Sequence, residues 1–244
     1  MGCAAQKDGR SIVIEPQAHG TQPTPRESDE RLSERPETGA PASTPRQDDL
    51  FEGLGPAIDA DFTTARRIEL DETSWIEHVP GWLRASGRLF DELMATAPWE
   101  QRHRYMWSKR VIEPRLTAEY RDVAGAPQQL LRSAADTLSC HYGVAYRYLW
   151  LNLYRTHRDS TSWHGDPIGK VQQTSTVPVL SLGATRRFLI KPTEGGKSLS
   201  LTVASGDLVV MGGRSQRDWR HSVPKQATPT GPRISVNFAP RLYP

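Results

Sequence analysis

Short apolar runs that alternate with turn residues fill the C-terminal half of the sequence, and they constrain its fold more than any other feature. Small clusters such as EGG, ASGD and MGG lie between some of them. The runs are VPVLSL, RRFLIK, SLSLTV, DLVVM and RISVNF. Short strands at this spacing are typical of β-sandwiches and barrels, whereas parallel sheets need long helical crossovers. We therefore expect mainly antiparallel β-structure in this half.

Two amphipathic segments before these runs predict helices. Residues 86–99 place Leu89, Phe90 and Leu93 on one face, and Pro98 ends the pattern. Residues 127–143 begin with a proline, carry apolar residues at helical spacing and end near Gly143. The expected fold class is thus α+β, mainly β, with N-terminal helices.

The first fifty residues differ in composition from the rest of the chain. They contain six prolines and no Phe, Trp or Tyr. Such a segment buries too little apolar surface to offset the entropy lost on ordering. We expect a disordered tail over residues 1–50 and one folded domain over residues 51–244.

Charge and cysteine content narrow the setting. The formal net charge of +3 neither requires nor excludes a nucleic-acid partner. The two cysteines, Cys3 and Cys140, indicate no disulfide framework and favour a reducing, cytoplasmic location. No apolar run reaches the ~18 residues typical of a membrane span, so we expect no membrane association. No feature indicates a protein partner.

The stretch YLWLNLY, residues 148–154, predicts a strand with two unlike faces. Side chains alternate across a strand, so its three leucines share one face while Asn152 and Tyr154 share the other. A face that carries Trp, Asn and Tyr is unusual for an apolar core. It indicates the wall of a polar cavity.

Two histidines and an aspartate after this strand are candidate metal ligands. His164 and Asp166 are two residues apart, so on extended backbone both point the same way, and His221 follows another predicted strand. Two imidazoles and one carboxylate are the ligand set of non-heme Fe(II) oxygenases. The same set occurs in hydrolytic zinc sites, and an H-x-D pair also arises by chance.

Arg233 begins the last predicted strand and is a candidate anchor for an acidic cosubstrate. The planar guanidinium group binds a carboxylate at two points. A surface charge on a strand is the alternative interpretation of Arg233.

Four stretches of the sequence, which contain the candidate residues above, together resemble the AlkB family of Fe(II)- and 2-oxoglutarate-dependent dioxygenases. The resemblance runs from about Trp75 to Arg241 and keeps the order of the family's motifs. It implies a double-stranded β-helix, or jelly roll, with a nucleotide-recognition lid. The stretches are NLYRTHRDSTSWHGD, LSLGATRRFLI, SGDLVVMGGRSQRDWRHSVPK and PRISVNF.

The resemblance assigns roles to individual positions, with Fe(II) as the metal and 2-oxoglutarate and O2 as cosubstrates. The implied iron ligands are His164, Asp166 and His221. The implied cosubstrate contacts are Asn152, Tyr154, Arg233, Ser235 and Arg241. The lid segment EPRLTAEY, residues 113–120, suggests substrate contacts by Arg115, Tyr120 and Trp163.

The chain departs from the family pattern at two positions. Ala239 stands where family members usually have a second arginine near the cosubstrate, and Arg241 is expected to face the same way as Arg233 and Ser235. Ile168 stands where many base-repairing members have an acidic residue.

Oxidative demethylation of N-alkylated bases in DNA or RNA is the function that the resemblance implies. A target base must be single-stranded or flipped out of its stack to reach the metal. Residues 101–110 mix four Lys or Arg side chains with Tyr105 and Trp107, which suits nucleic acid or a solvated face equally. Two alternatives remain: a hydroxylase or demethylase of a protein or small molecule, and a non-catalytic nucleic-acid-binding AlkB-like protein.

Overall fold

The computed structural model describes residues 55–106 and 109–243. For residues 104–106 and 109 it describes the backbone only. The predicted disordered tail, residues 1–50, lies outside the described residues. So do the side chains of Tyr105 and Trp107.

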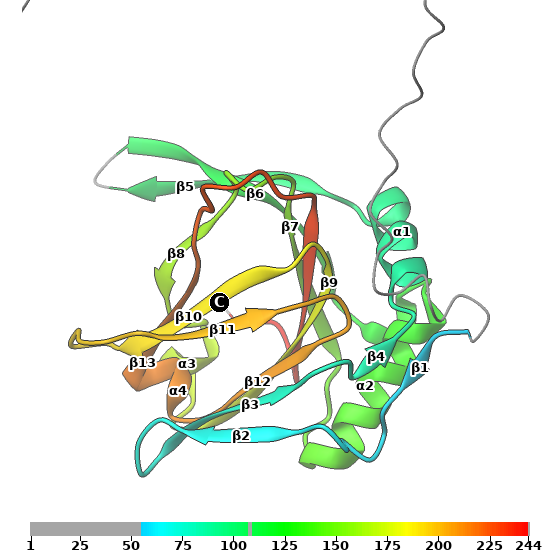
Figure 1. The fold of residues 1–244 in the computed structure, drawn as a ribbon, viewed down its shortest axis with the longest axis horizontal. Coiled ribbons are helices and arrows are strands. Elements are labelled where there is room, and N and C mark those ends of the chain that lie inside the picture. The colour runs from blue at the N-terminus through cyan, green and yellow to red at the C-terminus, as the bar shows by residue number, and fades with distance from the viewer. Residues whose placement is uncertain (1–54, 107–108, 244) are drawn as a thin grey trace, which may run out of the picture. The chain divides into compact units, whose positions relative to one another are not determined.

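Two antiparallel β-sheets form the body of the structure (Figure 1). The larger has eight strands in the order β2 (Arg66–Glu69), β3 (Ser74–Val79), β12 (Leu208–Gly213), β9 (Ser175–Gly183), β14 (Arg233–Ala239), β7 (Tyr148–Tyr154), β6 (Lys109–Tyr120) and β5 (Glu100–Met106). The smaller has four, in the order β11 (Leu199–Val203), β10 (Arg186–Pro192), β13 (Trp219–Val223) and β8 (Thr161–His164). A separate pair joins β1 (Ala57–Ile58) to β4 (Leu83–Arg84). The predicted double-stranded β-helix is confirmed.

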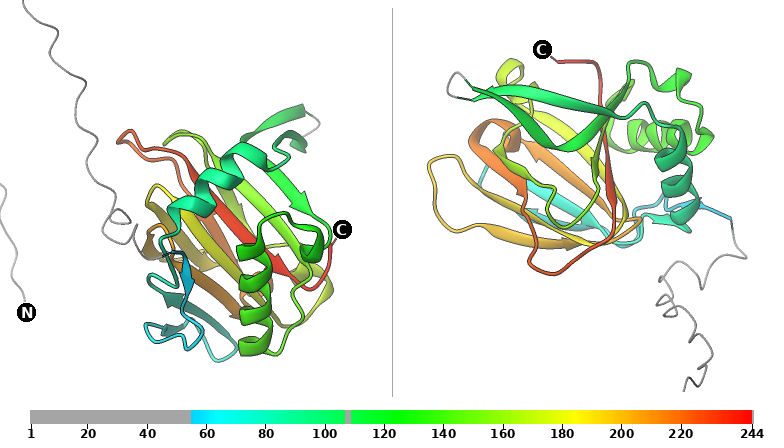
Figure 2. Two further views of the ribbon diagram at one scale, coloured as in Figure 1. Left: turned by 90° about the vertical axis from the view of Figure 1, so that its right-hand side faces the viewer. Right: turned by 90° about the horizontal axis from the view of Figure 1, so that it is seen from above.

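Two helices cover the outer face of the larger sheet, as both views in Figure 2 show. They are α1 (Gly87–Thr96) and α2 (Gln129–Tyr142), and both agree with the sequence prediction. Gly143 ends α2 with a φ of 65°, a left-handed conformation that glycine adopts without steric cost. Shorter helical turns are η2 (Val123–Gly125), α3 (Ile168–Val171) and α4 (Ser215–Asp218).

The alternation of β7 divides the interior into two layers. Leu149, Leu151 and Leu153 belong to the core between the helices and the larger sheet. The intervening side chains of β7 face the space between the two sheets. β14 repeats the pattern beside β7, because Ile234, Val236 and Phe238 join the same helical core. The period-2 pattern therefore determines which side chains reach the inter-sheet space.

A second apolar cluster fills part of the space between the two sheets, next to the polar side chains of β7 and β14. It contains Val177, Phe188, Ile190, Val209 and Met211, drawn from both sheets. All five side chains are buried. The polar residues of β7 and β14 thus lie next to a buried apolar cluster.

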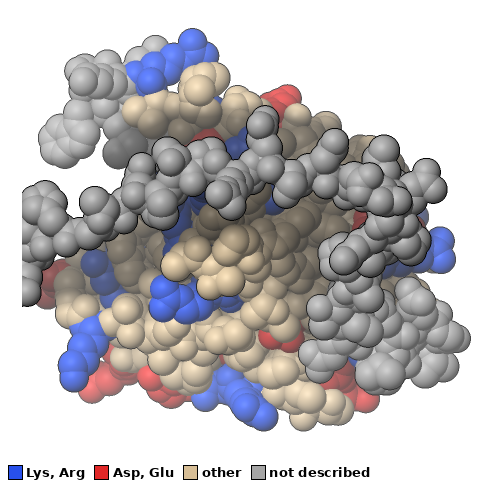
Figure 3. Space-filling view, turned by 45° about the horizontal axis from the view of Figure 1, so that its top comes forward, with Lys and Arg blue, Asp and Glu red and all other residues tan. Residues whose placement is uncertain are grey.

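Most strands after α2 follow the predicted apolar runs, but several elements were not predicted. One of them is the β5–β6 hairpin, since residues 101–110 were interpreted as a nucleic-acid contact or a solvated face and no strand was predicted there. Lys and Arg are interspersed with Asp and Glu on the face in Figure 3, in agreement with the low net charge. Within the described part of the chain, no helix is long and apolar enough to cross a membrane.

Candidate active site

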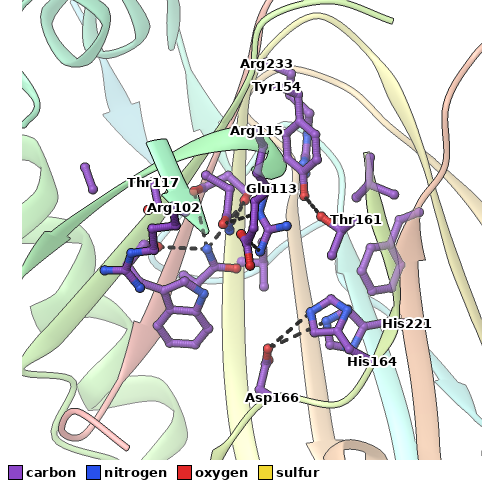
Figure 4. Close-up of a pocket in the computed structure, with 18 of the residues that line it drawn as sticks. Arg102, Glu113, Arg115, Thr117, Tyr154, Thr161, His164, Asp166, His221 and Arg233 are labelled. Carbon is purple, nitrogen blue, oxygen red and sulfur yellow. Dashed lines mark hydrogen bonds and ion pairs between the residues drawn. The ribbon is translucent and has the colours of Figure 1, made fainter. Parts of the chain in front are cut away.

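Three candidate metal ligands meet in the chamber between the sheets (Figure 4). The Nε2 atoms of His164 and His221 lie 3.7 and 3.8 Å from Oδ1 of Asp166. One ligand atom from each residue lies within 4.8 Å of the other two. A metal ion about 2.0–2.2 Å from each ligand atom separates two ligands by at most about 4.4 Å, so both histidine–aspartate distances fit a shared ion.

A β-bulge directs His164 into the chamber. His221 pairs with His164 and Val223 pairs with Thr161, so two steps along β13 correspond to three along β8. The extra residue lets Thr161 and His164 both face inward although an odd number of steps separates them. The intervening Ser162 and Trp163 are exposed.

Close packing of α4 fixes the turn between His164 and Asp166. The side-chain Oε1 of Gln216 accepts a hydrogen bond of 2.7 Å from the backbone N–H of Asp166. A Cβ atom at Gly165 would lie 2.3 Å from the backbone oxygen of Gln216. Only glycine at position 165 therefore lets α4 approach closely enough to hold Asp166.

The protonation chemistry of the three residues fits a divalent cation. Nδ1 of His164 lies 2.8 Å from the carbonyl oxygen of Ser162, which leaves Nε2 as the free ligand atom when Nδ1 carries the proton. Burial lowers the pKa of His221, and the nearby His164 acts in the same direction, so His221 is neutral. Burial raises the pKa of Asp166. A bound cation offsets this desolvation and favours the ionised carboxylate.

Arg233 supplies a cation without a counter-ion at the other end of the chamber. Its side chain is 2 % exposed, and its Nε donates a 2.9 Å hydrogen bond to Oγ of Ser181. Its Nη1 has no hydrogen-bond partner. Among the described residues, no carboxylate pairs with Arg233. A buried, unpaired guanidinium nitrogen is costly, so this geometry fits the carboxylate of a bound ligand such as 2-oxoglutarate.

Tyr154 lies between two buried arginines. Its ring centroid is 5.3 Å from Cζ of Arg233 and 5.5 Å from Cζ of Arg186. Its hydroxyl is 2.6 Å from Oγ1 of Thr161. Tyr154 therefore fixes the Arg233 end of the chamber and offers a polar atom next to it.

A hydrogen-bonded network of four side chains lines the same cavity. Nε of Arg115 donates to Oδ1 of Asn152 at 2.8 Å, and Nδ2 of Asn152 donates to Oγ of Ser235 at 3.2 Å. Glu113 pairs with Nη2 of Arg115 at 3.2 Å. The predicted contacts Asn152, Ser235 and Arg115 thus line one cavity together with the three metal-ligand candidates.

Three predicted site residues do not line this cavity, so their predicted roles inside it find no support here. Trp163 is 38 % exposed, because the β8 bulge turns it outward. Tyr120 packs against the helical core at the end of β6 and does not line the cavity. Arg241 is exposed beyond the end of β14, with its guanidinium over the ring of Tyr243. The strand ends at Ala239, so strand alternation does not extend to position 241.

Several residues that shape the cavity were not predicted. Glu119 forms an ion pair with Arg102 at the cavity wall. Trp150 also lines the cavity, as the alternation of residues 148–154 predicted. Ser181 and Thr161 act only through contacts between distant strands, which the sequence does not display.

The fold and the site together define a class of protein, a jelly-roll oxygenase with a two-histidine, one-carboxylate metal centre. Residues 88–238 match the family described as the 2OG-Fe(II) oxygenase superfamily. The chain belongs to this superfamily, whose members use Fe(II) and 2-oxoglutarate.

Relatives within the superfamily carry AlkB names, which confirms the resemblance found in the sequence. The chain is 28 % identical over 197 residues to human alpha-ketoglutarate-dependent dioxygenase alkB homolog 3, covering 72 % of this chain and 64 % of the relative. It is 32 % identical over 119 residues to DNA oxidative demethylase ALKBH2 of Arabidopsis thaliana, covering 39 % and 38 %. The solved structure of OsALKBH1 shares the fold, with a TM-score of 0.50 and 13 % identity over 73 % of this chain and all of that one.

Proposed function

We propose that the chain is an Fe(II)- and 2-oxoglutarate-dependent dioxygenase that demethylates N-alkylated bases in DNA or RNA. One observation carries the proposal. The His164, Asp166 and His221 cluster and the unpaired Nη1 of Arg233 face the same cavity. A metal-binding end and a carboxylate-binding end in one chamber match the two ends of 2-oxoglutarate.

Each group of residues has a distinct task in this proposal. His164, Asp166 and His221 would hold Fe(II) through two imidazoles and one carboxylate, a ligand set that leaves coordination positions for other ligands. Arg233, held by Ser181, binds the distal carboxylate of 2-oxoglutarate and so orients the keto acid toward the metal. Bound Fe(II) with 2-oxoglutarate and O2 supplies the oxidising power to hydroxylate a methyl group on a ring nitrogen, and the product then loses formaldehyde.

The chamber walls contribute containment and orientation. Val179, Phe188, Met211 and Val223 give the cavity an apolar part of its wall. Asn152 stays fixed because Arg115 and Ser235 bind its two amide ends. No side chain acts as a nucleophile in this mechanism.

The nucleic-acid substrate is supported by the names of the relatives. Human alkB homolog 3 is an alpha-ketoglutarate-dependent dioxygenase, and the Arabidopsis relative is a DNA oxidative demethylase. This chain spans only about 64–65 % of the length of the alkB homolog 3 relatives from human and Bos taurus. Because Asp166, His221 and Arg233 are buried in the cavity, we propose that the base enters from a single strand or after flipping.

Formaldehyde release from methylated oligonucleotides tests the proposal. The protein, loaded with Fe(II) and 2-oxoglutarate in air, is given single-stranded DNA or RNA that contains a base methylated on a ring nitrogen. We expect formaldehyde and succinate in equal amounts, and neither product from unmethylated oligonucleotides above the background rate. Succinate release stimulated by methylated peptides alone would refute the nucleic-acid substrate.

A protein or small-molecule substrate is the second candidate, and Ile168 is the observation that favours it. Position 168 is buried and apolar, so it supplies no acid to recognise a cationic base. Glu113 and Glu119 line the cavity, but each is paired with an arginine. The same assay with a peptide and metabolite panel distinguishes the two candidates.

A binding role without catalysis is the third candidate, motivated by Ala239. Adding 2-oxoglutarate to the oxygen-free, Fe(II)-loaded protein produces a visible charge-transfer band if the cosubstrate chelates the metal. A missing band with intact nucleic-acid binding would favour the non-catalytic protein.

A further inference from the structure

The outward-facing side of the smaller sheet carries an exposed tryptophan and two basic side chains, and the short helices α3 and α4 add one basic side chain each. We call it the outer basic surface, and it comprises Trp163, Lys170, Lys191, Arg217 and Arg220. The ammonium group of Lys191 lies 4.5 Å from the ring centroid of Trp163. Lys191 is also the direct ladder partner of Arg220 across β10 and β13. The side chains of Ile190 and His221, one residue away, are buried, so Lys191 and Arg220 share the outer face.

A surface depression connects this basic surface to the metal site. Lys170, Arg217 and Arg220 line it together with His164 and Asp166. Nη1 of Arg217 donates to the backbone oxygen of Gly169, which joins the two short helices α3 and α4 at its rim. A chain lying along the depression would therefore end beside the metal ligands.

The charge of this surface is not neutralised locally. Within the described part of the chain, none of its four cationic side chains forms an ion pair with a carboxylate. Asp218 also lines the depression, but Arg214 binds both of its oxygens, at 2.6 and 3.1 Å. The surface thus has four positive charges available for an anionic partner.

We propose that the outer basic surface binds the strand that flanks the target base, with one base stacked on Trp163 and phosphates bound by Lys191 and its neighbours. Exposed aromatic rings between cations are the usual platform for single-stranded nucleic acid, because every base has a face that stacks. An acidic protein would use the charges but would not need the exposed ring. This inference rests on the proposed nucleic-acid substrate and adds where the strand lies.

Binding of an unmethylated oligonucleotide tests the surface without any turnover. The probe is fluorescein-labelled (dT)12, and its affinity for the full chain is followed by fluorescence anisotropy at several salt concentrations. We expect Trp163→Ala to weaken binding roughly tenfold, and Trp163→Phe to retain most of the affinity. Lys191→Ala should weaken binding severalfold and reduce the slope of log affinity against log salt by about one.

Arg84→Ala is the matched control, since Arg84 is exposed on β4 in the separate β1–β4 pair. Its affinity for (dT)12 should equal that of the wild type. Trp163 is next to His164 on β8, so a change at Trp163 can disturb the metal site itself. Lys191→Ala tests the same surface from β10 and leaves β8 unchanged.

The inference is overturned if the wild type does not bind (dT)12. It is overturned as well if Trp163→Ala and Lys191→Ala both bind (dT)12 as tightly as the wild type does. Tighter binding of polyglutamate than of (dT)12 by the wild type would also overturn it. None of these binding results changes the outcome of the formaldehyde assay, which tests the proposed function separately.

Discussion

His164 and His221 are direct partners across the β8–β13 ladder, and their ring centroids lie 4.2 Å apart. The sequence separates them by 57 positions, whereas the smaller sheet sets them side by side. Asp166 completes the site from the turn that follows β8. Metal binding therefore depends on strand pairing within the sheet as much as on the three residues.

Replacing Asp166 with Ala should abolish Fe(II)-dependent turnover. The variant loses the one carboxylate ligand, and two imidazoles alone bind Fe(II) weakly. The fold should persist, since Asp166 lines a cavity. Turnover is measured as formaldehyde release and folding by circular dichroism, with the exposed Asp136→Ala as the control. Wild-type turnover in Asp166→Ala would contradict the ligand assignment.

Replacing Arg233 with Met should raise the concentration of 2-oxoglutarate needed for half-maximal turnover. A charge-assisted hydrogen bond contributes about 1.5–3 kcal/mol, which corresponds to roughly 10- to 150-fold. The exposed Arg187→Met is the control and should behave as the wild type. If both variants have the same 2-oxoglutarate dependence, Arg233 is not the carboxylate anchor.

Replacing Arg241 with Ala should leave the 2-oxoglutarate requirement unchanged within about twofold. Its guanidinium lies over the ring of Tyr243, with Cζ 5.3 Å from the centroid, and outside the cavity. Substituting an exposed side chain that takes part in no core, cap or buried network usually changes stability or binding little. A rise comparable to that of Arg233→Met would show that the end of the chain rearranges when the cosubstrate binds.

Replacing Arg186 with Met should destabilise the fold by about 2–5 kcal/mol. Arg186 is 1 % exposed and donates to the backbone oxygens of Thr156, Asp159 and Pro224. Three loop carbonyls lose their donor in the variant. Urea unfolding measures the free-energy change. A stability equal to that of Arg187→Met would show that other donors satisfy these carbonyls.

Asp71 should contribute stability that is lost in acid. Although burial opposes it, hydrogen bonds from Trp219 and Thr73 lower the pKa of Asp71 from 3.8 to about 2. Because the folded-state pKa is the lower one, the stabilisation is complete above pH ~4 and disappears as the pH falls toward ~2. Asp71→Asn should flatten this part of the pH–stability curve, measured by thermal unfolding. An unchanged slope would mean that the Asp71–Trp219 bond does not persist in solution. The effect is small, since Asp71 is exposed.

The sequence by itself determined the local structure and the chemistry available to the site. Its periodicity predicted both long helices, and alternation in β7 separated the leucines from Asn152 and Tyr154, because side-chain direction along a regular strand depends only on position. The order of motifs also indicated the superfamily.

Only the tertiary structure decided which of these side chains meet. The β8 bulge turned Trp163 outward and His164 inward, and the end of β14 at Ala239 left Arg241 outside the cavity. Ser181 reaches Arg233 from β9 across a ladder of distant residues. Bulges, strand ends and pairings arise from packing between segments far apart in the chain, so no local pattern records them.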